Sequence, residues 1–362
     1  MIRFSFGILL VASIMVSARR GSSVRPDRVR AGGPEDPTGS SLALVSPLNS
    51  ELTLPYYGMH GVFSSDLATV SDLGTEVILM SFRHDGTPEE WLAYLNAASA
   101  EDIRVIAWLW PQGWHLEHYV YMPLVLSRGP SVLPAPSSAE HAESLRTVFP
   151  AEKRGSWQID EQARLFLQTV SAHPALFAVY ALHEPYWNGC WGCGYTTTQQ
   201  QALYSAIKSI ADVPIHSAVD SMSAWTRYAE EQDKDTAFAD GMCDYCETWY
   251  HPFREDDTFE KATLISHVEA DLAVARARAP NAKIVWSMQC FAQEVPLGDD
   301  YRMPTAEEMR DLASIVYSRG VDGALWYPWD FQGGLYSDFL SNHPELYPVV
   351  REIYDEIVRS PQ

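Results

Sequence analysis

Acidic side chains recur along the chain at the ends of short apolar runs, where a fold can hold them in place. The five such residues are Asp85, Glu184, Asp220, Glu247 and Asp330. Two carboxyl groups in unlike surroundings can divide acid–base chemistry, because one keeps a proton near neutral pH while the other stays ionised. Glu184 is followed by Pro185 and Tyr186, and surroundings that exclude water raise the pKa of a carboxyl group. We therefore predict that Glu184 is the proton donor of such a pair.

Tryptophan is concentrated at the same positions, and most of the 12 tryptophans lie in or just after the apolar runs. An aromatic ring presents a flat apolar face that suits the C–H surface of a sugar ring, whereas other tryptophans simply fill a core. We expect Trp286 to belong to the core. The tryptophans expected to stack on sugar are Trp110, Trp187, Trp249 and Trp329. This pattern favours a carbohydrate ligand.

A short apolar run followed by a helical stretch repeats eight times and supplies the elements that position these residues. The predicted strands are Tyr56–Val62, Glu76–Phe82, Arg104–Trp110, Leu176–Leu182, Ile215–Val219, Cys243–Trp249, Lys283–Cys290 and Gly323–Tyr327. Strands that alternate with helices form a parallel sheet. Eight such units predict an α/β protein with a single (β/α)8 TIM barrel. A long loop insertion, 111–158, follows the third strand.

The active site of such a barrel lies at the C-terminal ends of its strands, where the carboxylates and tryptophans are expected to meet. The chain has no glycine-rich phosphate motif, so no nucleotide cofactor is expected. The end of the fourth strand, Ala181-Leu182-His183-Glu184-Pro185, resembles the Asn-Glu-Pro signature of the (β/α)8 glycoside hydrolase superfamily. The resemblance implies that Glu184 is the general acid/base and that the substrate is a polysaccharide or oligosaccharide. It also implies that His183 stands where an Asn contacts the sugar 2-hydroxyl.

The second carboxylate is less clearly marked, because the same resemblance requires a nucleophilic Glu at the end of the seventh strand, where this chain has Gln289. Alternation along the sixth strand places Tyr245, Glu247 and Trp249 on one face. We therefore predict Glu247 as the second catalytic carboxylate, with Asp330 and Asp220 in reserve. Tyr245 is expected to interact with its charge and to bind substrate. Gln289 and Asp330 are expected to bind substrate.

Two alternatives remain open at this point. The missing strand-seven Glu fits a non-catalytic barrel that only binds carbohydrate. A metal-dependent barrel hydrolase or lyase would instead use rim histidines, for which the candidates are His60, His84, His183 and His251. We predict no metal.

The N-terminus has the features of an export signal, because a basic start precedes a short apolar run that ends in Val16-Ser17-Ala18. We predict a signal peptide over 1–18, a flexible leader over 19–50 and the barrel over 51–362. The protein is then secreted or periplasmic, and no membrane insertion is expected after cleavage. A net charge of −21 excludes nucleic acid as a partner.

Four of the five cysteines form two CxxC pairs, Cys190 with Cys193 and Cys243 with Cys246. Cys243 and Cys246 are predicted to face opposite ways in the sixth strand, and export favours oxidation. We expect a disulfide between Cys190 and Cys193, or between one of them and Cys246. A four-thiolate zinc site and free buried thiols are the alternatives.

Overall fold

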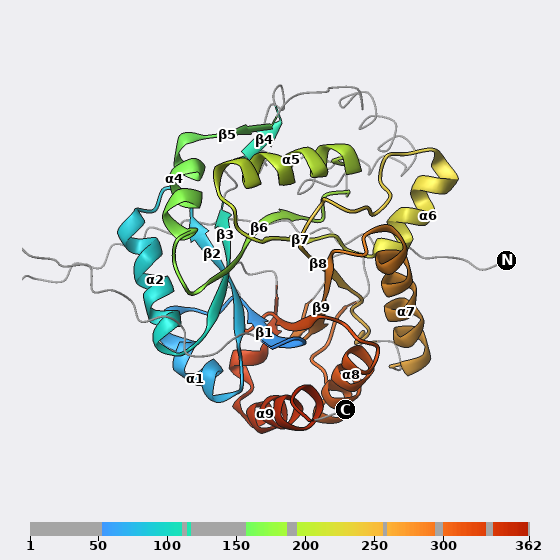
Figure 1. Ribbon diagram of the computed structural model, residues 1–362. Coiled ribbons are helices and arrows are strands. Elements are labelled where there is room, and N and C mark those ends of the chain that lie inside the picture. Colours follow the sequence, from blue (N-terminus) through green and yellow to red (C-terminus); the bar gives the residue numbers. More distant parts are fainter. Residues whose placement is uncertain are drawn as a thin grey trace, which may run out of the picture.

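A computed structural model describes residues 53–110, 114–116, 157–186, 194–255, 259–293, 300–330 and 336–360. Eight parallel strands close into a barrel, and the predicted (β/α)8 TIM barrel is confirmed (Figure 1). In order around the barrel the strands are β1 (Tyr56–His60), β2 (Val77–Arg83), β3 (Arg104–Trp110), β6 (Leu176–His183), β7 (Ile215–Ala218), β8 (Tyr245–Trp249), β9 (Lys283–Gln289) and β11 (Gly323–Tyr327). The predicted signal peptide, the leader and most of the insertion after β3 lie outside the described residues.

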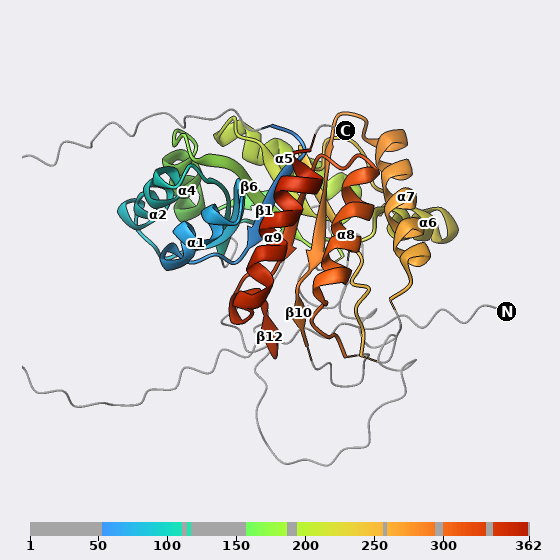
Figure 2. The ribbon, with the colours of Figure 1, turned by 90° about the horizontal axis from the view of Figure 1, so that it is seen from below.

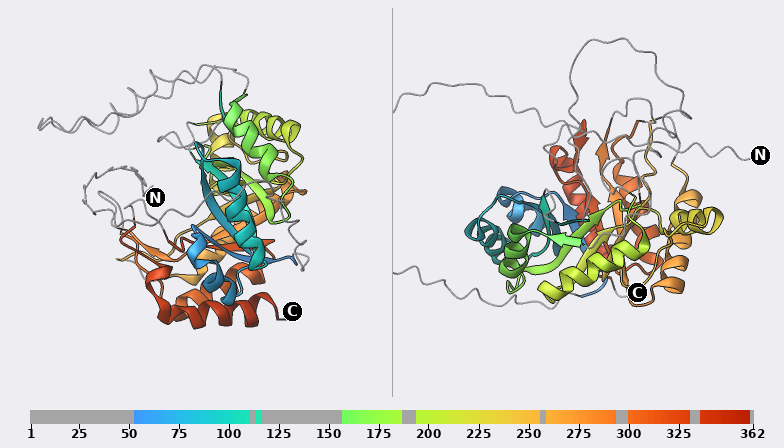
Figure 3. Two further views of the ribbon diagram at one scale, coloured as in Figure 1. Left: turned by 90° about the vertical axis from the view of Figure 1, so that its left-hand side faces the viewer. Right: turned by 90° about the horizontal axis from the view of Figure 1, so that it is seen from above.

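Helices follow the strands and form the outer layer, as Figures 2 and 3 show from other sides. They are α1 (Leu67–Asp72), α2 (Pro88–Ala100), α4 (Glu161–Val170), α5 (Thr197–Ile210), α6 (Met222–Gln232), α7 (Lys261–Arg278), α8 (Ala306–Ser318) and α9 (Tyr347–Ile353). Capping boxes at Thr87 and Thr305 start α2 and α8. None of the helices in the described ranges is long and apolar enough to cross a membrane.

Two short antiparallel pairs lie outside the barrel. Strand β4 (Trp114–Leu116) pairs with β5 (Trp157–Ile159), so both ends of the predicted insertion meet. Strand β10 (Phe291–Ala292) pairs with β12 (Asp338–Phe339). The second pair extends beyond the barrel, near the first residues of α8 and α9 (Figure 2). Short 3-10 turns complete the described elements at Ser64–Asp66, Leu340–Asn342 and Pro344–Leu346, with a π-helical turn at Tyr354–Val358.

The apolar core has two parts, divided by the barrel wall. The larger part joins the outward side chains of the strands to the helices, whereas a smaller cluster that includes Tyr56, Phe177 and Tyr180 fills the interior. Gly323 makes room for the Tyr56 ring, since a Cβ there would lie 2.6 Å from it. Gly58 likewise has no space for a side chain against the Val77 carbonyl. The interior is therefore packed rather than hollow, as in other barrels of this class.

The disulfide prediction is wrong for Cys246. Cys243 and Cys246 bond to each other, with their Cα atoms 5.6 Å apart. The sequence places Cys243 within the sixth strand, but β8 begins only at Tyr245, and a bend at Asp244 brings the two thiols together. Cys246 is therefore not available to Cys190 or Cys193, and neither cysteine of this pair can serve a four-thiolate zinc site. A bond between Cys190 and Cys193 falls on residues that the structure does not describe.

Candidate active site

Glu184 and Asp220 follow the neighbouring strands β6 and β7, and both adopt a left-handed backbone, with φ of 46° and 63°. Such conformations cost energy for residues with a side chain and gather at functional sites. Burial raises the pKa of Glu184 to about 7. Burial first, and then the charge of Glu184, raises the pKa of Asp220 to about 7. The two carboxyl groups therefore lie close enough for the charge of Glu184 to affect the ionisation of Asp220.

Hydrogen bonds hold these two residues in place. The Glu184 backbone N–H donates to the Ala218 carbonyl at 2.9 Å, which joins the end of β6 to β7. The Asp220 carbonyl accepts from the Thr248 hydroxyl at 2.7 Å, and Trp225 Nε1 lies 3.4 Å from Asp220 Oδ2. The backbone strain at the rim is therefore balanced by contacts from β8 and from the start of α6.

Glu247 points into the barrel and is 1 % exposed. His60 Nε2 lies 2.8 Å from its Oε1, and His216 Nε2 lies 2.9 Å from its Oε2. Burial alone would raise the pKa of Glu247, but His60, His216 and Ser287 outweigh burial and lower it below its ordinary value. Glu247 is therefore ionised under conditions in which Glu184 still holds a proton.

Tyr327, at the end of β11, lies near both Glu184 and Glu247. Burial raises the pKa of Tyr327 to about 12, and the charges of Glu184 and Glu247 both contribute to the rise. The Tyr327 hydroxyl lies 2.7 Å from that of Tyr336, and the ring meets His60 edge to face at 4.9 Å. One phenol therefore lies within electrostatic reach of both carboxyl groups.

An arc of nearly parallel rings lines this end of the barrel. It runs through Trp108, His183, Trp249, His251 and Tyr327, with successive planes tilted by 29°, 16°, 16° and 14°. Burial lowers the pKa of His183 to about 4 and that of His251 to about 3, so both rings are neutral at pH 7. The arc offers uncharged ring faces and N–H groups beside the two carboxylates.

His183 has a defined partner within this arc. Its Nδ1 lies 2.8 Å from the Tyr180 hydroxyl. Because the ring is neutral, a hydroxyl that donates to Nδ1 leaves the proton on Nε2. His183 then presents an N–H donor where the resemblance expects an Asn side chain.

Tyr245 lies on the same face of β8 as Glu247 but nearer the start of the strand. Its ring packs against Phe177 at 4.5 Å and against Tyr56 at 6.2 Å, in the interior cluster. Successive inward residues of a strand are separated by about 6.6 Å along it. Tyr245 is thus one layer below Glu247, away from the rim.

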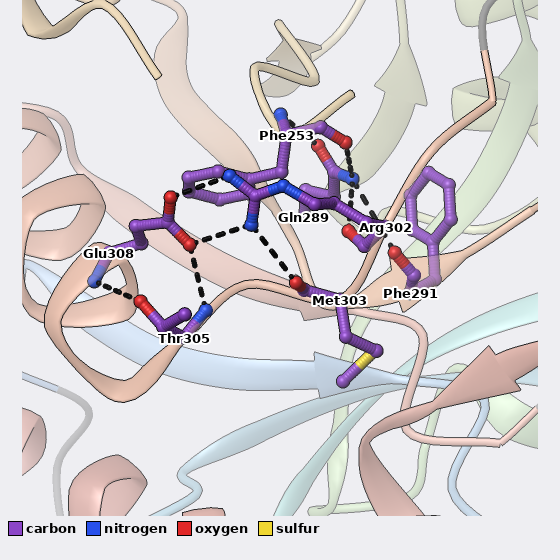
Figure 4. A network of polar contacts seen from close by, with 7 residues as sticks. All are labelled: Phe253, Gln289, Phe291, Arg302, Met303, Thr305 and Glu308. Carbon is purple, nitrogen blue, oxygen red and sulfur yellow. Dashed lines mark hydrogen bonds and ion pairs between the residues drawn. The ribbon is translucent and has the colours of Figure 1, made fainter. Parts of the chain in front are cut away.

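Gln289 is fully buried and ties three segments together (Figure 4). Its Oε1 accepts from the Phe253 N–H at 3.0 Å, and its Nε2 lies 3.0 Å from the Phe253 carbonyl and 3.2 Å from that of Arg302. Arg302 in turn forms two contacts with Glu308, at 2.8 and 2.6 Å. The Gln289 carboxamide, at the end of β9, therefore makes its hydrogen bonds to backbone groups.

The remaining predicted residues occupy different places. Trp329 is 2 % exposed, packs against Tyr347 and lies with Nε1 3.2 Å from Asp66. Asp330 is half-buried, and its carbonyl approaches Gly61 after β1. Trp110 ends β3, but its side chain and all of Trp187 lie outside the described part of the chain.

The four histidines of the metal alternative have separate partners. His60 contacts Glu247, and His84 lies 2.9 Å from Asp160, the N-cap of α4. His183 bonds Tyr180, and His251 is surrounded by the rings of Trp249, Phe291 and Tyr327. Within the described ranges, no group of three or more histidine, cysteine or acidic side chains has a geometry that could hold a metal ion.

Sequence reasoning missed His216 and Tyr180, although both left a signal. Each is a polar residue within an otherwise apolar run, and both lie on the inward faces of their strands. His60, which ends β1, was weighed only as a metal ligand. The signal that could have found these residues is a titratable side chain in phase with the barrel interior.

No family model matches the sequence, and no curated protein matches it. Among solved structures, the chain is similar to a GH5_18 protein from Streptomyces cattleya in complex with Manβ1-4GlcNAc, at 15 % identity and a TM-score of 0.51, covering 85 % of this chain and 82 % of the other. It is also similar to endo-glycoceramidase II from Rhodococcus sp. in a cellobiose-like imidazole complex, at 12 % identity and a TM-score of 0.50, covering 83 % and 78 %. At these identities the likeness is one of fold, and the shared fold is the (β/α)8 barrel.

Trp249 and Trp329 should respond differently to replacement by alanine. Trp249 is half-buried at the rim, so we expect weaker oligosaccharide binding and little change in melting temperature. Trp329 is buried in the core, so its loss should destabilise the protein by about 3–5 kcal/mol. Calorimetric binding and thermal unfolding of both variants check this. Equal destabilisation by both substitutions would show that Trp249 is a core residue rather than a sugar contact.

Proposed function

We propose that the protein is a glycoside hydrolase that cleaves glycosidic bonds in a polysaccharide or oligosaccharide. The observation that carries the proposal is a pair of buried carboxyl groups whose pKa values are pushed in opposite directions at the C-terminal end of a barrel: Glu184 upward and Glu247 downward. Glycoside hydrolysis requires such a pair, one protonated and one ionised. The fold shared with solved glycoside hydrolases supports the same assignment.

In this proposal Glu184 gives its proton to the glycosidic oxygen as the bond breaks. Glu247 remains ionised. It either attacks the anomeric carbon, where positive charge develops, to form a glycosyl-enzyme that water then hydrolyses, or it takes a proton from the water that attacks this carbon directly. Trp249 supplies a ring face for the sugar, and the neutral His183 donates from Nε2 to a hydroxyl group. Asp220 lies close enough for the charge of Glu184 to raise its pKa, so Asp220 also holds a proton near neutral pH.

Three residues that the sequence predicts to bind substrate have other roles in this proposal. Gln289 positions the segments around Phe253 and Arg302, Tyr245 belongs to the layer below the site, and Trp329 supports the rim from the core. Trp110, Trp187 and Asp330 remain proposed sugar contacts. We also propose export with removal of residues 1–18, and an exported protein that still begins at Met1 would contradict this part.

A panel of defined polysaccharides and oligosaccharides tests the activity. Wild-type protein should release reducing ends from at least one neutral glycan, and the same preparation carrying Glu184→Gln should not. Metal chelation should leave the activity unchanged. Release that persists in Glu184→Gln would show that a contaminating enzyme or another acid is responsible.

A carbohydrate-binding barrel without catalysis is the second candidate, and Gln289 favours it. The position that the resemblance reserves for a nucleophile is bonded on every side to backbone groups. The same panel separates the two candidates, because a binding protein would retain a glycan on an affinity gel without releasing any reducing ends.

A further inference from the structure

Two histidines from different parts of the barrel converge on Glu247. His60 ends β1, which is separated from β8 by β9 and β11, so its side chain reaches Glu247 across the interior. His216 lies on the neighbouring strand β7, in register with Tyr245. His60 is 7 % exposed and His216 is 0 % exposed. Each carboxylate oxygen of Glu247 therefore has its own imidazole.

The protonation of His216 follows from its surroundings. Burial lowers its pKa to about 4, although the charge of Glu247 acts in the opposite direction. A neutral imidazole beside a carboxylate oxygen can form a hydrogen bond only if the facing nitrogen carries the proton. Nε2 of His216 is thus a donor. Its Nδ1 is buried without a partner in the described part of the chain, which suits a nitrogen that has no proton to donate.

The other titratable groups around Glu247 supply no positive charge at neutral pH. Apart from His216, the groups whose pKa responds to its charge are Tyr56, Tyr180, His183, His251 and Tyr327. The pKa values of the tyrosines are raised and those of the two histidines are lowered, so all five are neutral. Ser287 on β9 adds one hydrogen bond to Glu247. The charge of Glu247 is therefore stabilised by His60, His216 and Ser287, and the electrostatic effect of His60 is the largest of these contributions.

We propose that His60 and His216 are positioning residues that together keep Glu247 ionised and fix both of its oxygens, so that β8 supplies the anion that β9 lacks. This inference rests on the proposed function for its catalytic meaning, but the effect on ionisation does not. Without the two donors, burial would dominate, and Glu247 would take up a proton at a higher pH. The pair should matter most in the acid range.

Substitutions at the two histidines test the proposal. His60→Phe and His216→Phe remove the donor, whereas His60→Gln and His216→Gln keep an N–H group near the Nε2 position. The carboxyl ¹³C resonance of Glu247, assigned from its absence in Glu247→Gln, is titrated without substrate. Each Phe variant should raise the pKa of Glu247 by about one unit or more, and each Gln variant should restore most of the difference.

Turnover provides the second readout. In each Phe variant the acid limb of kcat/KM should move upward with the pKa of Glu247, so that the loss of activity is larger at pH 5 than at pH 7. His173 bonds Asn96 outside the barrel interior, so His173→Gln serves as the matched control and should leave the profile unchanged. If a Phe variant does not fold, His60→Asn and His216→Asn, which are too short to reach Glu247, take its place.

The possible results separate this inference from the proposed function. An unchanged pKa of Glu247 in the Phe or Asn variants would overturn the inference, whatever the activity. A raised pKa in a protein whose wild type hydrolyses no glycan would support the positioning role and reject the hydrolase.

Discussion

Glu184→Gln is expected to lower kcat on an unactivated oligosaccharide by about 10²–10⁴-fold, the usual contribution of a positioned general acid. The glutamine keeps the size of the side chain but has no acidic proton to give to the leaving oxygen. Because burial holds the pKa of Glu184 at about 7, wild-type activity should also fall as the pH rises through 7, where the acid loses its proton. The variant should lack this alkaline limb.

An activated aryl glycoside distinguishes loss of the acid from general damage. Its leaving group needs no protonation, so Glu184→Gln should recover much of the wild-type rate on that substrate. Glu76 lies just before β2, at the opposite end of the barrel, and pairs with Arg359, so Glu76→Gln is a suitable control that should keep full activity. Equal losses on both substrates would remove Glu184 from the role of proton donor.

Glu247→Gln is expected to lower kcat by at least about 10²–10³-fold, the effect of losing a preorganised charge next to the reacting centre. The substitution also has a structural cost. One face of the carboxamide is an NH₂ group, which would meet the Nε2–H of His60 or His216, and an unsatisfied buried donor costs about 1–3 kcal/mol. Steady-state kinetics and thermal unfolding measure the two effects separately.

The outcome for Glu247 is checked against the two reserve carboxylates. If Glu247→Gln keeps most of the activity while Asp220→Asn or Asp330→Asn loses it, the ionised partner of Glu184 is the residue whose variant fails. Substrate binding by Glu247→Gln should persist in either case, because Trp249 and His183 are unchanged.

The barrel could be predicted from the sequence because its signals are local. Each apolar run ends near an acidic or aromatic residue, and parallel strands carry those ends to one rim, which is why Glu184, His183 and Trp249 meet. The ranges differ by at most two residues at either end, as for the sixth strand, where a bend at Asp244 delays the start of β8 and allows Cys243 to reach Cys246.

Other features depend on contacts between distant segments and could not be predicted. Gln289 is occupied by Phe253 and Arg302, which belong to segments that follow β8 and β10. The backbone N–H of Trp329 donates to the His60 carbonyl, so the chain after β11 folds back over β1 and buries the indole. Alternation gives the face of Tyr245 but not its depth in the barrel. The alternation of inward and outward side chains along a strand does not show which distant residues will contact a given side chain.

The aromatic filling at the start of the strands determines how the interior communicates with solvent. Tyr56 and Phe177 meet there edge to face at 5.2 Å, and Tyr245 packs against both. In the described part of the chain these rings fill the barrel below Glu247, so we expect water and protons to approach the carboxylate from the rim. A glycan long enough to cover the rim would therefore close this approach while it is bound. The number of water molecules near Glu247 during a turnover would then depend on the bound glycan rather than on bulk water.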